Sequence, residues 1–460
     1  MPIESLTVAG YRGFASPQTL RLAVPNGENG SGLTMLVGPN SGGKSTVIEA
    51  FRSLLQRTTP PSFSREERNG AAGERVSIKV KMAGGPTYAL ETIEGGGSET
   101  KWTGREAGGA SLPLFVLPSR RYFNPYFNRS SLDRANYTEN APVPAYRGVP
   151  TDRFPYRLFN AFEDRARFDE VLSRILDPLP ELVMEKSGQG PYYLKVQAGE
   201  SSHSSDGMGE GLVSLLTIVD ALYDSGEGSV IVIDEPELSL HPSLQRKLAT
   251  LLAEYATDRQ IVYATHSPYF LNISALFSGA QIARLIRTAD GCRVFQLDND
   301  LVAELEGLQR DVNNPHILGL SAREAFFLDD RIVLVEGQED VVIYPKILEQ
   351  LGMSVSGEFF GWGVGGADKM AKIAGLLRQL GFQRVAAILD GDKKDKLPGL
   401  REEFPDFLFL AIPADDVRCK KARPAHHEVE GLADSSGVLD PQHSDAARRI
   451  FEEVESYLAE

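Results

Sequence analysis

Apolar and polar residues alternate over residues 3–24, and this period of two predicts a β-meander near the start of the chain. An unbroken apolar run at residues 33–37 then predicts a fully buried strand. The rest of the first 300 residues predicts helices at about 45–56, 160–176 and 242–256, short strands between about 74 and 104, and buried strands at 229–233 and 261–264. Buried strands mixed with helices indicate an α/β fold.

After about residue 300 the pattern becomes a regular alternation of short strands and helices. The predicted strands are 332–335, about 357–364, 385–389 and about 408–412, and the predicted helices are about 339–351 and 367–379. Such alternation favours a compact unit with a mainly parallel sheet. The sequence therefore predicts a first domain at 1–300 with an insert near 118–200, a linker at 301–325 and a smaller α/β domain at 326–460.

Length and composition agree with a protein of several domains. The chain has 460 residues, which is too long for one ordinary domain. Its 48 Lys and Arg against 63 Asp and Glu give a net charge of −15, which excludes a uniformly basic surface but allows local basic patches. Its two cysteines, Cys292 and Cys419, are too few for a disulfide framework. No apolar run is long enough to span a membrane, so we expect a cytoplasmic protein without membrane contact.

The loop after the strand at 33–37 has the spacing of a phosphate-binding loop. It reads Gly-Pro-Asn-Ser-Gly-Gly-Lys-Ser over residues 38–45, a full match to G-x-x-x-x-G-K-[ST]. Its glycines let main-chain N–H groups surround phosphates, and the following helix N-terminus adds its positive dipole. A plain glycine-rich turn is the alternative, which the flanking strand and helix disfavour. We predict that ATP is held by Gly38, Asn40, Gly43, Lys44, Ser45 and Thr46, with the Ser45 hydroxyl on Mg²⁺.

Two later strand ends supply the groups that a nucleotide hydrolase needs. The apolar run at 229–233 is followed by Asp234 and Glu235. Asp234 can hold Mg²⁺, and Glu235 then lies where a carboxylate can polarise the attacking water. His266 follows the strand at 261–264, where it can contact the γ-phosphate and sense its loss. A structural histidine is the alternative for this residue.

A second phosphate-binding end precedes the strand at 229–233. Ser205 and Gly207 lie in a Gly/Ser-rich segment that opens a helix, and a helix N-terminus with a serine hydroxyl can bind phosphate. One nucleotide needs only one such cradle. We therefore expect a homodimer, or a larger even-numbered assembly, in which Ser205 of one chain caps the ATP that Lys44 of the other chain holds.

These motifs in this order resemble the ATP-binding-cassette (ABC) ATPase head of the RecF/SMC-like and OLD (overcoming lysogenisation defect) families. The resemblance covers roughly residues 1–290. It implies a Walker A loop at 38–45, a signature motif at 205–207, a Walker B pair at 234–235, a D-loop at 238–242 and a switch histidine at His266. The glutamine loop of the family is not evident, and residues 118–121 occupy the neighbouring place.

Acidic residues follow two strands of the second domain. Glu336 comes directly after the strand at 332–335, with Asp340 one helical turn later, and Asp390 and Asp392 follow the strand at 385–389. Adjacent parallel strands end at one edge of a sheet, so these carboxylates can converge. Carboxylates held together repel one another unless a cation neutralises them, and Mg²⁺ or Mn²⁺ suits oxygen ligands. We predict a metal site formed by Glu336, Asp340, Asp390 and Asp392, of which Glu336, Asp390 and Asp392 are the catalytic ligands.

These acids, with Gly365-Gly366-Ala-Asp-Lys369 between them, resemble the Toprim domain. An ABC-type head followed by Toprim is the architecture of the OLD family. The resemblance implies an ATP-regulated, metal-dependent DNA endonuclease, often linked to defence against phage. OLD nucleases use further acidic and lysine residues. In this chain five residues could fill those positions, and the sequence does not rank them: Asp415, Asp416, Lys420, Glu428 and Glu430.

DNA is the expected partner, and one segment has the composition to bind it. Residues 118–157 contain seven arginines and eight aromatic residues, and guanidinium groups bind phosphates while rings stack on bases. An arginine-rich loop packed on the ATPase is an equally good interpretation. Lys393, Lys394 and Lys396 could also draw a phosphate backbone toward the metal site.

Two other functions remain open at this level. The chain could be a RecF/SMC-like DNA clamp or sensor whose Toprim domain only binds a metal or a partner, including a protein encoded in the same operon. It could also be a topoisomerase-like strand transferase, which needs a tyrosine nucleophile near Glu336. Tyr344 and Tyr457 are the tyrosines available for that role in the second domain.

Overall fold

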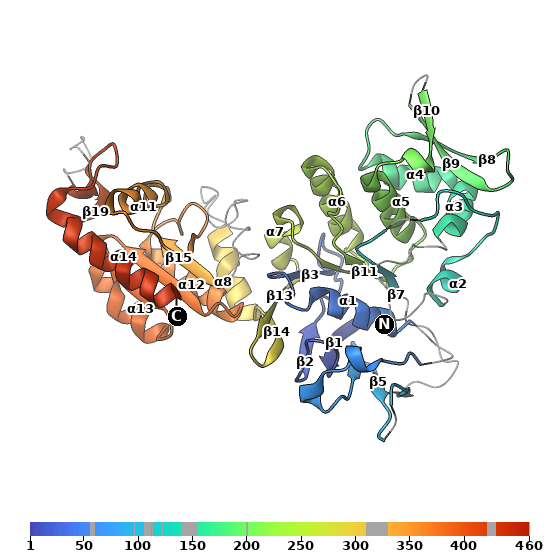
Figure 1. Cartoon of the computed structure of the whole chain (residues 1–460), viewed down its shortest axis with the longest axis horizontal. Coiled ribbons are helices and arrows are strands. Elements are labelled where there is room, and N and C mark those ends of the chain that lie inside the picture. The colour runs from blue at the N-terminus through green and yellow to red at the C-terminus, as the bar shows by residue number, and fades with distance from the viewer. Residues whose placement is uncertain are drawn as a thin grey trace. The chain divides into compact units, whose positions relative to one another are not determined.

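The computed structural model describes residues 1–55, 60–95, 97–104, 112, 114–121, 123–139, 154–198, 201–309, 330–420 and 429–459 (Figure 1). These residues form two compact units, Met1–Val294 and Phe295–Glu460. The division falls before the predicted boundary at 300, because helix α8 (Asn299–Gln309) packs on helix α12 (Met370–Gln379) of the second unit. Each unit is described by itself below.

The first unit is built on a six-stranded sheet in the order β14-β13-β3-β12-β11-β7. Neighbouring strands from β13 to β7 are parallel. The strands are β3 (Leu33–Val37), β7 (Leu114–Leu117), β11 (Val230–Asp234), β12 (Gln260–Ala264), β13 (Gln281–Thr288) and β14 (Gly291–Gln296). Every residue of β3, β11 and β12 is buried, which explains why the sequence shows them as continuous apolar runs.

A five-stranded antiparallel sheet in the order β2-β1-β4-β5-β6 packs beside the first (Figure 1). Its strands are β1 (Ile3–Ala9), β2 (Gln18–Arg21), β4 (Ser77–Met82), β5 (Thr87–Thr92) and β6 (Thr100–Thr103). Helix α1 (Lys44–Ser53) contributes Val47, Ile48, Ala50 and Phe51 to the core that both sheets share. The sequence predicted this β-meander and the helix that follows the Gly-rich loop.

The predicted insert carries its own small antiparallel sheet, β10-β9-β8, together with helices. Its strands are β8 (Glu181–Lys186), β9 (Tyr192–Ala198) and β10 (Ser201–Ser204), and its helices are α2 (Arg134–Glu139), α3 (Phe154–Glu163) and α4 (Arg165–Ser173). The single helix predicted at about 160–176 is thus two helices, which meet at Asp164. The remaining helices of the unit are α5 (Glu210–Tyr223), α6 (Pro242–Tyr255) and α7 (Ile273–Leu276).

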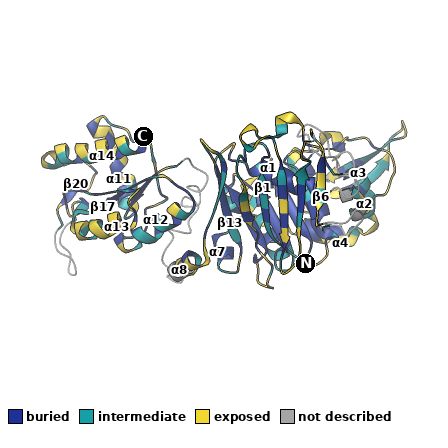
Figure 2. Cartoon of the chain, turned by 90° about the horizontal axis from the view of Figure 1, so that it is seen from below, coloured by how far each residue is buried: buried dark blue, intermediate teal, exposed yellow. Residues whose placement is uncertain are grey.

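The second unit has a parallel four-stranded sheet in the order β16-β15-β17-β18. Its strands are β15 (Arg331–Val335), β16 (Glu358–Phe359), β17 (Arg384–Leu389) and β18 (Leu408–Ala411), with a separate pair β19 (Asp416–Arg418) and β20 (Gly431–Ala433). Helices α11 (Gln338–Leu351), α12, α13 (Leu397–Glu403) and α14 (Ser444–Ala459) surround the sheet (Figure 2), and α8 packs on α12.

One predicted strand of the second unit is much shorter in the structure. The sequence predicts a strand at about 357–364, whereas β16 covers only Glu358–Phe359. Four glycines follow, at 361, 363, 365 and 366, and all have positive φ. This backbone conformation ends the strand and turns the chain back toward the end of β15.

Candidate functional site

The Gly-rich loop at 38–45 lies directly against the neighbouring strand β13. Gly38 has a φ of 122°, and a Cβ there would lie 2.3 Å from the carbonyl oxygen of Leu285. The Nζ of Lys44 donates hydrogen bonds of 2.8 Å to the carbonyl oxygens of Gly38 and Pro39. The lysine thus crosses the mouth of the loop, where phosphate oxygens would replace these carbonyls. Burial lowers the pKa of Lys44 to about 8.

The predicted nucleotide and metal residues meet in one pocket of about 320 Å³. Its lining includes Asn40, Gly43, Lys44, Ser45, Thr46, Glu235 and His266. Asp234, at the end of β11, lies beside it and accepts a 3.4 Å hydrogen bond from the Ser45 hydroxyl. A serine hydroxyl and a buried carboxylate side by side fit a hard divalent cation next to a bound nucleotide.

Glu235 lies in an unusual backbone conformation directly after β11. Its φ is 51°, a left-handed value that a residue with a side chain adopts at an energetic cost. Its N–H donates to the carbonyl oxygen of Ala264 at 2.8 Å, which ties it to the end of β12. This turn carries the Glu235 side chain into the nucleotide pocket, where it lines the wall together with His266.

Glu237 is a site residue that sequence reasoning missed. Its Oε1 accepts a 2.6 Å hydrogen bond from the main-chain N–H of His266, and burial raises the pKa of this carboxyl group. Burial, followed by the charge of Lys44, lowers the pKa of His266, which favours the neutral imidazole. The only signal in the sequence is a second acid two residues after Glu235.

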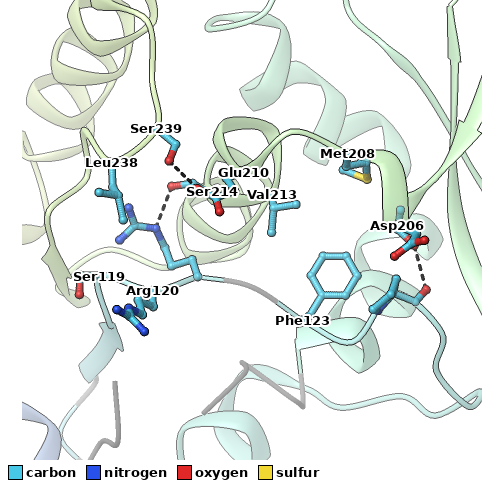
Figure 3. Close-up of a pocket in the computed structure, with 13 residues that line it drawn as sticks. Ser119, Arg120, Phe123, Asp206, Met208, Glu210, Val213, Ser214, Leu238 and Ser239 are labelled. Atoms are coloured by element: carbon cyan, nitrogen blue, oxygen red, sulfur yellow. Dashed lines mark hydrogen bonds between the residues drawn. The ribbon is translucent and has the colours of Figure 1, made fainter. Parts of the chain in front are cut away.

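The sequence placed Arg121 only within the 118–121 segment near the expected glutamine loop and among the arginines of 118–157, with no role of its own. Its guanidinium is buried and donates to the carbonyl oxygens of Asp234 and Glu235, both at 2.7 Å. Its Nε donates to the hydroxyl of Ser214 on α5 at 2.8 Å, a bond drawn in Figure 3. Arg121 therefore connects the helix that follows the predicted signature segment to the backbone that carries Glu235, the predicted catalytic acid.

The predicted signature residues lie outside the nucleotide pocket of their own chain. Ser205 and Gly207 form a short 3₁₀ helix, η3 (Ser205–Gly207), before α5. The Ser205 hydroxyl donates to the carbonyl oxygen of Pro125 at 2.8 Å. Ser205 lines a different pocket, of about 530 Å³, together with Arg120 and Leu238 (Figure 3).

In the second unit, the ends of β15 and β17 bring two predicted carboxylates together. Val335 pairs with Ile388 in parallel register, so Glu336 and Asp390 leave the sheet at the same edge. The main-chain N–H of Asp390 donates to Glu336 Oε1 at 2.9 Å. Both acids line a cleft of about 510 Å³, and Asp340, at the start of α11, lines it with them.

Burial and mutual repulsion raise the pKa values of the carboxyl groups in this cleft. Burial, with repulsion from Asp340 and Glu336, raises the pKa of Asp390 to about 8. Burial likewise raises the pKa of Asp340 to about 7 and lifts that of Glu336 above its usual value. The Oδ1 atom of Asp390 is buried without a hydrogen-bond partner among the described residues. A divalent cation would relieve the repulsion and bind this oxygen, so the residues fit a metal ion.

The cleft nevertheless lacks a ready-made ligand set. Among the residues that the structure describes, no three acidic, histidine or cysteine side chains lie in a metal-binding arrangement. The reason is local, because Glu336 accepts the N–H of Asp390 and Asp340 accepts the N–H of Gly337 at 2.8 Å. A metal bound here would draw these side chains away from the backbone.

The structure distinguishes among the remaining candidate acids and lysines. Asp416 and Lys420 line the cleft and form an ion pair with each other. Asp392 does not line it, and its exposed carboxylate pairs with Lys393 at 2.6 Å. The other described candidates do not line the cleft. Asp415 and Lys394 are exposed, Glu430 accepts a hydrogen bond from Gln442, and Lys396 pairs with Asp368. Glu428 lies outside the described residues.

The arginines of the 118–157 segment divide between packing and exposure. Arg157 is 1% exposed and is held by Asp220, also 1% exposed, and by Asp224 on the C-terminal side of α5. Arg134 also pairs with Asp224, and Arg121 is buried as described above. Arg120 and Arg129 are exposed, and Arg147 and Arg153 lie outside the described residues. Three of the described arginines therefore stabilise the fold.

Neither tyrosine of the second unit is placed to attack DNA. Tyr344 is 0% exposed, in the core between Phe359 and Phe451. The hydroxyl of Tyr457 donates to the carbonyl oxygens of Gln383 and Asp406, away from the carboxylate cleft. The structure gives no support to the strand-transferase hypothesis within the described residues.

Comparison with known proteins identifies the family. A model described as overcoming lysogenization defect protein-like, TOPRIM domain, matches residues 327–392. Two AAA-domain models match residues 5–110 and 202–272, the second described for a Type IV TA system. The OLD nuclease of Thermus scotoductus is 30% identical over 395 residues, which are 71% of this chain and 71% of that protein. The chain belongs to the OLD nuclease family.

Other relatives match shorter parts of the chain. The endonuclease GajA of Bacillus cereus is 22% identical over 134 residues, which are 26% of this chain and 19% of that protein. The SMC head domain from Thermotoga maritima has a TM-score of 0.41 and 14% identity, and the match covers 65% of this chain and all of that one.

As an OLD family member, the chain is an ATPase-linked nuclease. No helix among the described residues is long and apolar enough to cross a membrane.

Proposed function

We propose that the chain is an ATP-regulated endonuclease that cuts DNA at the carboxylate cleft of its second unit. The observation that carries the proposal is the pairing of Glu336 and Asp390 at the ends of adjacent parallel strands, where one buried oxygen of Asp390 has no hydrogen-bond partner among the described residues. Two acids in this state suit a cation and not an apolar ligand.

Glu336, Asp390 and Asp340 or Asp416 would hold Mg²⁺ or Mn²⁺ in the cleft. A divalent ion bound there stabilises charge on the attacking and leaving oxygens of a phosphodiester. Lys369 and Lys420 also line the cleft, and their ammonium groups can bind the phosphate oxygens next to the cut. The chain thus offers both acidic metal ligands and basic phosphate ligands within one opening.

The first unit would bind ATP and Mg²⁺ through the Lys44 loop, Ser45 and Asp234, and Glu235 would activate water. Ser205 lines a pocket of its own, away from the nucleotide pocket of the same chain. This separation supports a homodimer in which Ser205 and Gly207 of one chain reach the ATP of the other. Closure of that dimer is the step through which ATP would regulate cutting.

A DNA clamp or sensor with a weak Toprim site is the second candidate. One observation favours it, namely the absence of a ready metal-ligand set among the described residues. The family relationship favours the nuclease. A role in defence against phage, with or without a partner protein from the same operon, is a further proposal that rests on family resemblance alone.

The test is nicking of supercoiled plasmid with Mg²⁺ or Mn²⁺, with and without ATP. Wild type should nick, Asp390→Asn should not, and ATP should change the rate in wild type but not in Lys44→Ala. Glu452→Gln, at an exposed position on α14, is the matched control and should behave as wild type. If no metal supports nicking while DNA is still bound, the clamp or sensor is the better description.

A further inference from the structure

A second groove opens beside the carboxylate cleft, and nothing above assigns it a role. It has a volume of about 340 Å³, at the lower end of the range for small-ligand sites, and shares Gln338 and Glu339 with the cleft. Its apolar lining is Trp362, Val342 and Ile343. The two openings are therefore adjacent at the first turn of α11.

The exposed apolar side chains of the second unit gather at this groove. Among the described residues of that unit, the large hydrophobic side chains classed as exposed are Val342 at 48%, Trp362 at 50% and Val438 at 54%. Val342 and Trp362 line the groove, and Val438 follows Gly437, which also lines it. Apolar exposure concentrated at one place marks a binding surface better than exposure scattered over a domain.

The loop that carries Trp362 is fixed to the backbone of the proposed metal site. A Cβ on Gly363 would lie 2.6 Å from the Cα of Gly337, so the two chain segments touch. The N–H groups of Gly365 and Gly366 donate to the carbonyl oxygen of Glu336 at 2.9 and 2.8 Å. Trp362 is thus positioned relative to Glu336 by main-chain contacts.

Two basic side chains border the same groove. Lys346 is exposed, and its Nζ lies 3.5 Å from the carbonyl oxygen of Ser436. Arg418 is partly exposed and pairs with Glu339 at 2.6 Å, at the boundary with the carboxylate cleft. A half-exposed aromatic ring and an exposed lysine in one groove can bind a nucleotide, because the ring can stack on the base and the ammonium group attracts phosphate.

We propose that this groove binds a nucleobase of the DNA strand that is cut, with the base stacked on Trp362 and the adjoining phosphate near Lys346. The inference rests on the proposed function, since it takes the scissile phosphate to lie at Glu336 and Asp390. The stacked base would fix which phosphodiester enters the cleft, so Trp362 is a substrate-positioning residue.

Tryptophan fluorescence can test whether a base stacks on Trp362. It contains two tryptophans, Trp102 and Trp362, so Trp102→Phe leaves Trp362 as the only tryptophan emitter. With cleavage blocked by EDTA, a saturating single-stranded oligonucleotide should quench its emission. In labelled-oligonucleotide anisotropy, Trp362→Ala should weaken binding about 10-fold, Trp362→Phe should retain most of it, and Trp102→Phe should bind as wild type.

Bound oligonucleotide without quenching would overturn the inference, and so would an unchanged affinity in Trp362→Ala. In either case a protein partner would be the better explanation of the exposed apolar side chains in the groove. The two proposals fail separately. Quenching without nicking by wild type would overturn the nuclease and the positioning role of Trp362, but base binding in the groove would stand. Nicking without quenching would overturn base binding at Trp362 and leave the nuclease intact.

Discussion

The guanidinium of Arg121 donates a 2.7 Å hydrogen bond to the main-chain carbonyl oxygen of Glu235. Glu235 adopts a left-handed φ of 51°, and such strain persists only where surrounding contacts enforce it. Arg121 also donates a hydrogen bond to Ser214 on α5, so the position of the proposed catalytic carboxylate depends on a helix that begins beside the predicted signature segment.

Replacing Arg121 should therefore impair turnover more than nucleotide binding. We expect Arg121→Met to lower kcat for ATP about 100-fold with little change in KM, because a shift of about 1 Å in a catalytic group has that effect. Arg120→Met, at the exposed neighbour in the same pocket, is the matched control. Steady-state ATPase kinetics decide the matter, and a rise in KM with unchanged kcat would show that Arg121 contributes to binding instead.

Glu235→Gln should bind ATP without hydrolysing it and accumulate as a dimer. The amide keeps the shape of the side chain but cannot accept a proton from water. Size-exclusion chromatography with light scattering should show the dimer only when ATP is present. Adding Lys44→Ala to the same protein should abolish it. A Glu235→Gln protein that stays monomeric with ATP bound would contradict the two-chain arrangement.

Arg157 and Asp220 form a buried ion pair whose loss should destabilise the first unit. Asp220→Ala should cost about 3–5 kcal/mol, because it leaves a guanidinium buried with only part of its partner charge. The control is Asp169→Ala, which removes the partly exposed pair with Arg165 and should cost about 1 kcal/mol or less. Urea unfolding measures both values, and equal losses would mean that the buried network is no stronger than a surface pair.

Asp415 and Asp416 offer a matched pair of adjacent acids in the second unit. Asp416 lines the carboxylate cleft, whereas Asp415 is exposed outside its lining. Asp416→Asn should weaken Mn²⁺ binding about 10-fold or more, and Asp415→Asn should leave it unchanged. Isothermal titration with Mn²⁺ in the absence of DNA gives the answer without relying on activity. The same loss in both variants would indicate a general charge effect.

The sequence predicted the site residues that follow buried strands. Asp234, Glu336 and Asp390 each end or follow an apolar run, so local pattern and the geometry of parallel sheets were enough to locate them. The loop at 38–45 was predictable for a similar reason, because its spacing is determined by the phosphates it surrounds.

Residues that act through long-range packing could not be predicted in this way. Arg121 contacts Glu235, which lies 114 residues later in the chain. The sequence named Asp416 among five candidates but could not rank it, because its place in the cleft depends on the separate strand pair β19 and β20. Composition also could not separate binding arginines from structural ones. The acidic partner of Arg157, Asp220, lies 63 residues later on a helix whose position only the fold determines.

The central claim is that the phosphodiester is cut where Glu336 and Asp390 meet. The most direct measurement is the initial rate of plasmid nicking by Glu336→Gln at saturating Mn²⁺, compared with Glu358→Gln at an exposed acid on neighbouring β16. We expect no detectable nicking by Glu336→Gln and a wild-type rate for Glu358→Gln. Nicking by Glu336→Gln at the wild-type rate would contradict the claim and move the cutting site elsewhere in the protein.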